Sequence, residues 1–216
     1  MQAATYNDSK LDLQFVLSDK LTAENVEKTL SSMDGIVVAP GFGQRGIEGK
    51  IHALKYAREH DVPTLGICLG MQCMVIEFAR NVLGLEDANS TEMNPHTPFK
   101  VIDLMEEQKN ITDMGGSMRL GAYKCELEKG SLGFKAYGKK LIQERHRHRF
   151  EFNSDYREDY ENNGMKCTGI NPDTKLVEMV EIPGKKWYLG VQFHPEYNST
   201  VLSPNPLFLS FVKAIV

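Results

Sequence analysis

Two short apolar segments constrain the fold of this 216-residue chain more than any other feature. Residues 35–39 (Gly-Ile-Val-Val-Ala) and 64–67 (Thr-Leu-Gly-Ile) have the length and composition of strands, and a turn that contains glycine follows each of them. Amphipathic helices are predicted after these turns, over 47–60 and 69–82. Strands that are apolar at every position and alternate with helices are typical of a parallel sheet covered on both faces. We therefore predict that residues 35–39 form a strand buried on both faces.

The rest of the chain extends this pattern in both directions. Apolar and polar residues alternate over 11–17, which predicts a strand with one buried face, and a helix is predicted from Thr22 to about Ser32. Beyond residue 84 the predicted elements are strands at 99–105, 119–127 and 143–152, a short helix at 155–163, strands at 167–171, 176–181 and 187–193, and a terminal helix at 206–216. The expected fold class is α/β: a single domain over residues 1–216, with a doubly wound, mostly parallel central sheet flanked by helices and an antiparallel extension.

The composition fits a globular domain and argues against several classes of protein. Hydrophobic residues make up 41% of the chain, charged residues 25%, and the formal net charge is −4. An acidic balance argues against nucleic acid as a partner. No apolar run approaches the ~18 residues of a membrane span, and the first residues show no signal-peptide pattern. The four cysteines lack metal-site or disulfide-scaffold spacing, so we expect a reducing, cytoplasmic location.

Cys68 is the first candidate for chemistry, because it lies between the second predicted strand and its helix, in Gly66-Ile67-Cys68-Leu69-Gly70. A nucleophile in this position is typical of a strand-to-helix elbow, where flanking glycines permit a tight turn with strained dihedral angles. The N-terminus of the following helix is expected to lower the pKa of the thiol and favour the thiolate. The alternative is a buried core cysteine, which is what we predict for the other three cysteines.

His194 and Glu196 directly follow the last predicted apolar strand. Parallel sheets gather their sites at the carboxyl ends of strands, so we expect His194 to lie near Cys68. In such a triad Cys68 would attack, His194 would shuttle the proton and Glu196 would hold the imidazole tautomer. A surface histidine beside an unrelated acid is the alternative, and the presence of the elbow favours the catalytic interpretation.

Residues 40–46 (Pro-Gly-Phe-Gly-Gln-Arg-Gly) form a glycine-rich turn after the first buried strand. Backbone N–H groups in such a turn, together with the N–H of Leu69, can receive a developing oxyanion. A plain turn is the alternative. The sequence contains neither a GxxxxGK(S/T) nor a GxGxxG pattern, so a phosphate-binding loop is not predicted.

Residues 144–149 (Glu-Arg-His-Arg-His-Arg) combine basic side chains with a strand-like alternation. On a strand the three arginines would lie on one face and the two histidines on the other. An arginine row can bind a phosphate or a carboxylate, and a His-x-His pair can ligate a metal. Since no cluster of cysteines or carboxylates completes a metal site, no metal is predicted.

Together these motifs resemble the class I, or triad, glutamine amidotransferases. The likeness rests on residues 66–72 (Gly-Ile-Cys-Leu-Gly-Met-Gln) and on His194-Pro195-Glu196. Residues 89–92 (Asn-Ser-Thr-Glu), 115–121 (Gly-Gly-Ser-Met-Arg-Leu-Gly) and 144–149 narrow it to the branch whose glutaminase supplies ammonia for the amination of UTP to CTP. The likeness covers essentially the whole chain and implies a flavodoxin-like arrangement of its sheet and helices.

The resemblance implies that the side-chain amide of L-glutamine is hydrolysed to glutamate and ammonia through a γ-glutamyl thioester on Cys68. It also assigns five further residues: oxyanion N–H groups from Gly41 and Leu69, and binding of the glutamine backbone by Gln72, Glu92 and Arg149. Glu92 suits the α-ammonium group and Arg149 the α-carboxylate, since a zwitterion needs one partner of each sign.

Further partners follow from the same resemblance. No cofactor is expected in this domain. The ammonia would pass to a separate synthetase domain, absent from this chain, in which UTP activated by ATP and Mg²⁺ is aminated. GTP would act as an allosteric activator through the loop at residues 42–46, and the full enzyme is expected to be a homotetramer.

The resemblance also leads us to expect that the chain lacks the first strand and helix of the family's domain, which would leave two unpaired edges or a cleft in the sheet. Two rival functions stay open. A stand-alone cysteine hydrolase of γ-glutamyl bonds would not require the motifs at 115–121 and 145–149. An inactive binding or regulatory module would not need to keep Cys68, His194 and Glu196 together.

Overall fold

The computed structural model describes residues 1–104 and 118–216; Met105 and the first three residues of the 115–121 motif lie outside the described residues. The strands are β1 Ile36–Val38, β2 Thr64–Ile67, β3 Asn89–Ser90, β4 Lys100–Leu104, β5 Arg119–Leu127, β6 Leu141–His148, β7 Phe150–Phe152, β8 Lys166–Ile170, β9 Val177–Glu181 and β10 Tyr188–Val191. The helices are α1 Gln2–Thr5, α2 Val26–Leu30, α3 Ile47–Glu59, α4 Leu69–Asn81, α6 Leu132–Tyr137, α7 Arg157–Asn162 and α8 Pro206–Ile215.

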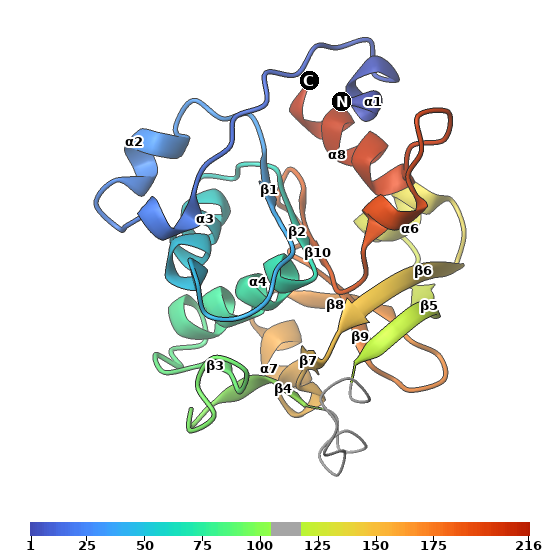
Figure 1. Cartoon of the computed structure of the whole chain (residues 1–216). Coiled ribbons are helices and arrows are strands. Elements are labelled where there is room, and N and C mark those ends of the chain that lie inside the picture. The colour runs from blue at the N-terminus through green and yellow to red at the C-terminus, as the bar shows by residue number, and fades with distance from the viewer. Residues whose placement is uncertain (105–117) are drawn as a thin grey trace.

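A seven-stranded sheet with strand order β1-β2-β10-β9-β8-β5-β6 runs through the molecule, and a smaller sheet, β3-β4-β7, lies below it in the view of Figure 1. Strands β1, β2 and β10 pair in parallel, with Val191 of β10 opposite Ile67 of β2. The other described pairings of the large sheet are antiparallel. The sheet is therefore mixed, and its antiparallel part is larger than the predicted extension.

Helices cover both faces of the parallel part, as the sequence predicts. Helices α3 and α4 lie on one side, and α1 and α8 lie on the other (Figure 1). The two sides correspond to separate apolar cores, one centred on α4 with Met71, Met74 and Phe78, and one that contains Leu189 and Phe211. Burial of these side chains is the main favourable term that holds the helices against the sheet.

The C-terminal helix begins where its capping residues predict. The side chain of Asn205 accepts a hydrogen bond from the N–H of Leu207 at 3.0 Å, and Pro206 occupies the first helical position. Phe211 on this helix packs edge-on against Trp187 with ring centroids 5.2 Å apart. The strand that leads to residue 194 is thereby anchored from outside the sheet.

Two predictions about the start of the chain are wrong. Residues 11–17 form no strand, and Phe15 is 88% exposed, because the alternation has no neighbouring strand to pair with. Strand β1 forms where predicted but is not buried on both faces, since Val37 is 49% exposed. In the described residues β1 lies at one edge of the large sheet.

Smaller differences concern element boundaries. Helix α2 is shorter than predicted and starts after Asn25 rather than at Thr22. The single strand predicted over 143–152 is two strands, β6 and β7, which belong to different sheets and are separated by a bend at Arg149. Helices α1 and α6 were not predicted. In the described part of the chain, no helix combines the length and apolarity that crossing a membrane requires.

Candidate active site

Cys68 occupies a strained elbow between β2 and α4, as predicted. Its backbone has φ 52° and ψ −104°, a conformation that residues with a β-carbon rarely adopt. Its N–H donates to the carbonyl of Val191 at 2.7 Å, which ties the elbow to β10. A β-carbon on Gly66 would lie 2.8 Å from the backbone of Gly70, so the turn requires glycine at that position.

The thiol of Cys68 is not a pre-formed thiolate. Burial raises its pKa to about 12, and the carboxylates of Glu196, Glu151 and Glu92 raise it further, whereas the N–H of Leu69 lowers it. The N–H at the helix start lowers the pKa as predicted, but the thiolate is not favoured overall, because the desolvation of the sulfur outweighs a single N–H donor. Proton removal must therefore accompany attack by this sulfur.

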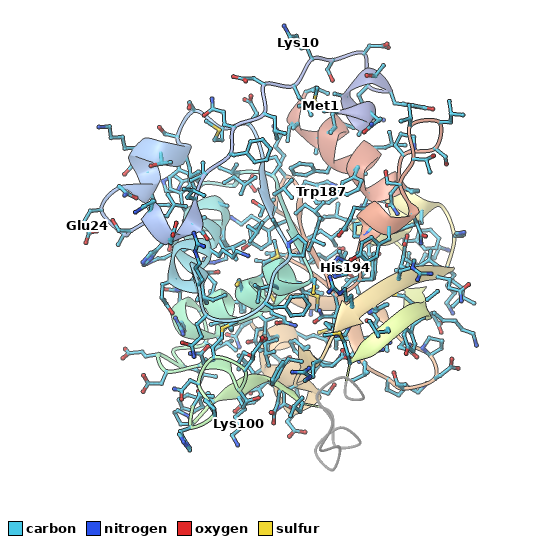
Figure 2. The ribbon with its side chains drawn as sticks, viewed as in Figure 1. Met1, Lys10, Glu24, Lys100, Trp187 and His194 are labelled. Carbon is cyan, nitrogen blue, oxygen red and sulfur yellow. The ribbon has the colours of Figure 1, made fainter. Side chains whose placement is uncertain are left out.

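His194 and Glu196 form a close pair just beyond the carboxyl end of β10. His194 Nδ1 lies 2.6 Å from Glu196 Oε1, and Tyr197 stacks on the imidazole with ring centroids 4.8 Å apart. Because a carboxylate only accepts, Nδ1 carries the proton and Nε2 presents a lone pair. Nε2 is buried and has no hydrogen-bond partner among the described residues. His194 lies near the middle of the molecule (Figure 2).

The pairing of β2 with β10 places the elbow and the His194–Glu196 pair at adjacent strand ends, although no hydrogen bond joins the cysteine sulfur to the imidazole. The thiol of Cys68 is instead within donor distance of the carbonyl of Arg147, at 4.0 Å. Since Nε2 has no hydrogen-bond partner among the described residues, the structure presents a base at the strand end next to the elbow.

A cavity of about 160 Å³ opens beside Cys68. It is lined by Gly41, Phe42, Cys68, Gln72, Glu92, Met118, His148, Arg149 and Phe150. Five of the eight predicted site residues are among these, and they include a carboxylate and a guanidinium. A space of this size accepts one small organic molecule. The lining offers that molecule a nucleophile and one partner of each charge.

The loop at residues 40–46 forms one wall of this cavity. Gly41 faces the helix start so closely that a β-carbon there would lie 3.2 Å from the side chain of Leu69. The N–H of Gly43 donates to Glu92 Oε1 at 3.1 Å, and Lys50 Nζ donates to the carbonyl of Ala39 at 2.9 Å. The two predicted oxyanion residues are thus neighbours: Gly41 lies in the loop after β1, and Leu69 is the first residue of α4.

Gln72 is held by the protein as well as exposed to the cavity. Its Nε2 donates to the carbonyl of Phe150 at 2.9 Å and to Gln192 Oε1 at 3.2 Å. Both amide protons are therefore used, and only the acceptor Oε1 is left for a bound molecule. An acceptor at this position suits an ammonium group.

Strand β6 shows the predicted alternation. Arg145 and Arg147 are exposed, whereas His146 and His148 are each only 2% exposed. His148 Nδ1 lies 3.2 Å from the carbonyl of Phe150, which fixes the proton there. His148 Nε2 then accepts from His146 Nδ1 at 2.8 Å. Burial lowers the pKa of both histidines, to about 3 for His148, so both rings are neutral.

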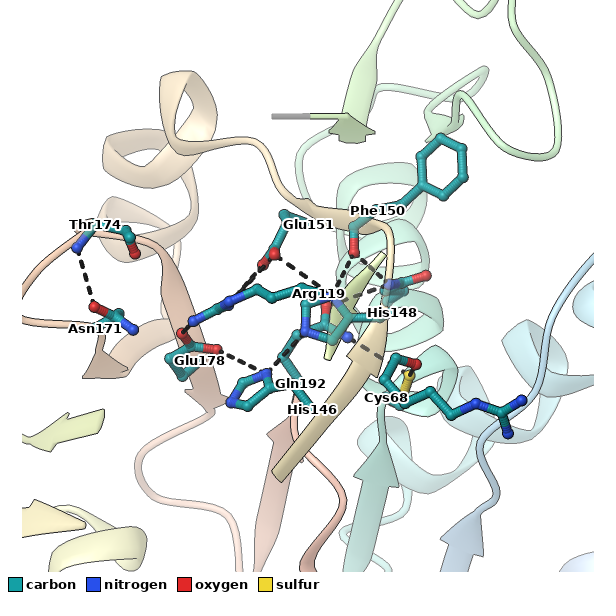
Figure 3. A network of polar contacts seen from close by, with 12 residues as sticks. Cys68, Arg119, His146, His148, Phe150, Glu151, Asn171, Thr174, Glu178 and Gln192 are labelled. Atoms are coloured by element: carbon teal, nitrogen blue, oxygen red, sulfur yellow. Dashed lines mark hydrogen bonds and ion pairs between the residues drawn. The ribbon is translucent and has the colours of Figure 1, made fainter. Parts of the chain in front are cut away.

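A buried ionic network behind the cavity was missed by the sequence interpretation (Figure 3). Arg119 on β5 donates to Glu178 at 2.6 Å and to Glu151 at 3.3 Å. Burial raises the pKa of both carboxyls, to about 8 for Glu151. Arg119 belongs to the 115–121 motif and Glu151 lies two residues beyond the 144–149 motif, but nothing local in the sequence shows that the two side chains meet.

Gln192 was also missed, although a signal for it exists. It is fully buried at the end of β10, and its Nε2 lies 3.7 Å from Cys68 Sγ. A single amide side chain within an otherwise apolar strand requires partners inside the protein, because an unpaired buried polar group is costly.

The fold and this arrangement of a cysteine elbow beside a histidine–glutamate pair define a class of enzyme domain. The family described as glutamine amidotransferase class-I matches residues 3–214, so the chain belongs to that family. The family and fold predicted from the sequence are thereby confirmed.

The relatives specify which branch of the family this is. CTP synthases of Porphyromonas gingivalis and Bacteroides thetaiotaomicron are 66% and 65% identical to the chain over 216 and 215 residues. The glutaminase domain of Trypanosoma brucei CTPS, solved with bound acivicin, is 39% identical and matches with a TM-score of 0.94 over 99% of this chain and 84% of that one. The chain corresponds to the glutaminase domain of CTP synthases, and it spans 40% of the length of the two bacterial relatives.

Proposed function

We propose that this domain hydrolyses the side-chain amide of L-glutamine and that the ammonia is used to aminate UTP to CTP. The observation that carries the first part is the cavity beside Cys68, in which Glu92 and Arg149 both line the wall. A free amino acid carries one charge of each sign, and this cavity offers the opposite pair next to a nucleophile.

In the proposed reaction Cys68 Sγ attacks the amide carbon of glutamine while its proton moves to His194 Nε2. Glu196 holds Nδ1–H and stabilises the imidazolium that forms. The oxyanion of the tetrahedral intermediate is received by the N–H groups of Gly41 and Leu69. Collapse breaks the C–N bond, the imidazolium protonates the leaving nitrogen, and ammonia departs from a γ-glutamyl thioester.

Hydrolysis of the thioester uses the same groups in reverse. His194 removes a proton from water, the hydroxide attacks the thioester carbon, and the sulfur leaves with the proton returned to it. The sum is glutamine plus water giving glutamate plus ammonia.

The fate of the ammonia lies outside this chain. We propose that it is passed to a synthetase domain that holds UTP, ATP and Mg²⁺, that GTP acts as an activator, and that the whole protein is a homotetramer. What supports this is the high identity to whole CTP synthases along the full length of the chain. A cytoplasmic location is part of the proposal, and four free, buried cysteines agree with it.

The test is release of ammonia from glutamine, together with covalent labelling. The chain should release ammonia, and a glutamine-like chloroketone should add one label at Cys68, located by mass spectrometry. Cys68→Ala should abolish both while leaving the circular dichroism unchanged. Label without ammonia release would favour an inactive binding module. Hydrolysis of other γ-glutamyl compounds as fast as glutamine would favour a stand-alone γ-glutamyl hydrolase.

A further inference from the structure

Gln192 reaches the reacting sulfur from within the sheet. Its side chain is fully buried, its backbone N–H donates to the carbonyl of Glu178 at 2.9 Å, and its Nε2 lies 3.7 Å from Cys68 Sγ. Figure 3 shows Gln192 between the ionic network and Cys68. The amide therefore contacts the nucleophile from a position that substrate does not occupy.

The hydrogen bonds fix which end of this amide faces the sulfur. The carbonyl of Phe150 can only accept, so Gln72 must direct its Nε2 toward it, at 2.9 Å. The same nitrogen faces Gln192 at 3.2 Å, so Gln192 must present its oxygen there. Rotating either amide by half a turn would bring two donors or two acceptors together. Gln192 consequently directs an N–H donor, not an acceptor, at Cys68.

A donor at this position meets a specific electrostatic need. The sulfur is surrounded by carboxylates, since Glu196, Glu151 and Glu92 all disfavour its negative form, and burial disfavours it more strongly. Among the described residues, the N–H of Leu69 and the side-chain amide of Gln192 direct donors at the sulfur and so favour its negative form. Hydrogen bonds to an ionised acceptor are stronger than those to a neutral one, so both donors bind the thiolate better than the thiol.

We propose that Gln192 is a catalytic residue of the reaction proposed above: its side-chain N–H stabilises the negative charge that develops on Cys68 Sγ as the S–H bond breaks and the proton moves to His194. Gln72 is then a positioning residue, because it sets the orientation of the Gln192 amide. The same contact stabilises the sulfur again when it leaves the thioester carbon.

The test separates this role from glutamine hydrolysis by following a reaction of the free protein. The rate at which iodoacetamide alkylates Cys68 is measured from pH 6 to 10, together with kcat and KM for glutamine. In Gln192→Glu an oxygen replaces the nitrogen that faces the sulfur, and in Gln192→Met the donor is removed. Gln143→Glu makes the same change at an exposed position of β6 and is the matched control.

We expect both Gln192 variants to be alkylated at least about tenfold more slowly at pH 8, with the profile displaced toward higher pH, and kcat to fall more than KM rises. Gln143→Glu should behave as the unsubstituted chain does. Folded Gln192 variants with alkylation rates within about twofold of the parent would overturn the proposal. If the parent is alkylated in this manner but releases no ammonia, the glutaminase function fails and the role of Gln192 stands.

A measurement on the unsubstituted chain covers the case in which the variants do not fold. The side-chain N–H₂ resonances of Gln192 are recorded before and after Cys68 is alkylated. Alkylation converts the thiol into a bulkier thioether that cannot ionise, so the contact with the Gln192 N–H should change, one of the two proton resonances should shift, and those of Gln143 should stay unchanged. An unchanged Gln192 spectrum contradicts the proposal.

Discussion

The carbonyl oxygen of Val38 lies so close to Gly70 that a β-carbon there would clash with it. The end of β1 thus contacts the first turn of α4, two residues after the nucleophile. A glycine in a helix costs conformational entropy relative to alanine, so its presence here requires a reason. The reason is close approach: the elbow can sit at the sheet only if the helix backbone comes within contact of the neighbouring strand.

Gly70→Ala should therefore disable the site by moving the elbow. We expect a loss of about 1–3 kcal/mol in unfolding free energy from overpacking, and a fall of about 100-fold in glutamine turnover, because a displacement of about 1 Å at a catalytic group has that effect. Chemical denaturation and an ammonia assay measure the two quantities.

Gly84→Ala is the control for this change. Gly84 has φ +73° and nothing within 4 Å of its would-be β-carbon, so alanine there is strained but touches nothing. The stability loss should be of the same order, about 1–2 kcal/mol, with turnover unchanged. Equal turnover in the two variants would contradict the role assigned to the Val38–Gly70 contact.

The reactivity of Cys68 should depend on pH in an unusual way. Because burial raises its pKa to about 12, the thiol form prevails at every pH below that value. The alkylation rate of the free protein should rise about tenfold per pH unit through pH 9 to 10 without a plateau. A plateau near pH 7 would show that the thiolate is already formed and would refute this expectation.

Glu151 should make the stability of the domain fall as pH rises. Its pKa is raised from an ordinary 4.5 to about 8, so the folded state binds a proton that the unfolded state has lost over that interval. The unfolding free energy then decreases from about pH 4.5 to 8, by up to about 1.4 kcal/mol per pH unit. The amide of Glu151→Gln does not titrate, so the decrease of unfolding free energy with pH should be smaller in this variant. Urea titrations at pH 5 to 9 measure it. Parallel slopes for parent and variant would exclude the assignment.

Arg119→Met should be strongly destabilising, because it leaves Glu151 and Glu178 buried without their cation. The expected loss is about 3–5 kcal/mol at pH 8. Arg45→Met is the matched control: the Arg45 side chain is 82% exposed in its pair with Asp19, so its loss should cost less than about 1 kcal/mol. Thermal and urea unfolding of both variants give the comparison.

Glu144 should support the turn that carries the histidine–glutamate pair. Its carboxylate accepts from Tyr137 Oη and Asn198 Nδ2, both at 2.6 Å, and from Asn205 Nδ2 at 2.9 Å. Glu144→Gln turns one acceptor into a donor against these donors, at a cost of about 1–3 kcal/mol, and turnover should fall with it. Glu126→Gln, at a half-exposed position of β5, weakens only a surface ion pair with Lys140 and should alter neither stability nor turnover by much. A Glu144→Gln protein with the same stability and turnover as Glu126→Gln would contradict this prediction.

Much of the fold was predictable because its signals are local. The lengths of α3, α4 and α8 follow from apolar periodicity and from end signals such as Asn205-Pro206. The elbow at Cys68 was predictable for the same reason, since a nucleophile flanked by small residues at a strand-to-helix junction has few other geometries. The position of His194 followed from the rule that neighbouring parallel strands end at one edge.

Other features depend on partners that no local pattern names. Residues 11–17 carry a strand pattern, yet none of the described strands pairs with them. The bend at Arg149 sends two halves of one predicted strand to different sheets. Whether a strand forms is decided by its hydrogen-bonding neighbour, which is a long-range property.

Local patterns in the sequence predict the α/β fold, the cysteine elbow and the strand end that carries His194 and Glu196. Which polar groups meet inside the protein depends on the packed fold: Arg119 contacts two carboxylates, and the amide of Gln192 contacts the sulfur of Cys68. Burial and hydrogen-bond pairing act between chain segments that are distant in sequence, so no local pattern reveals these contacts. For the same reason desolvation, which sequence spacing does not reveal, raises the pKa of Cys68 instead of lowering it.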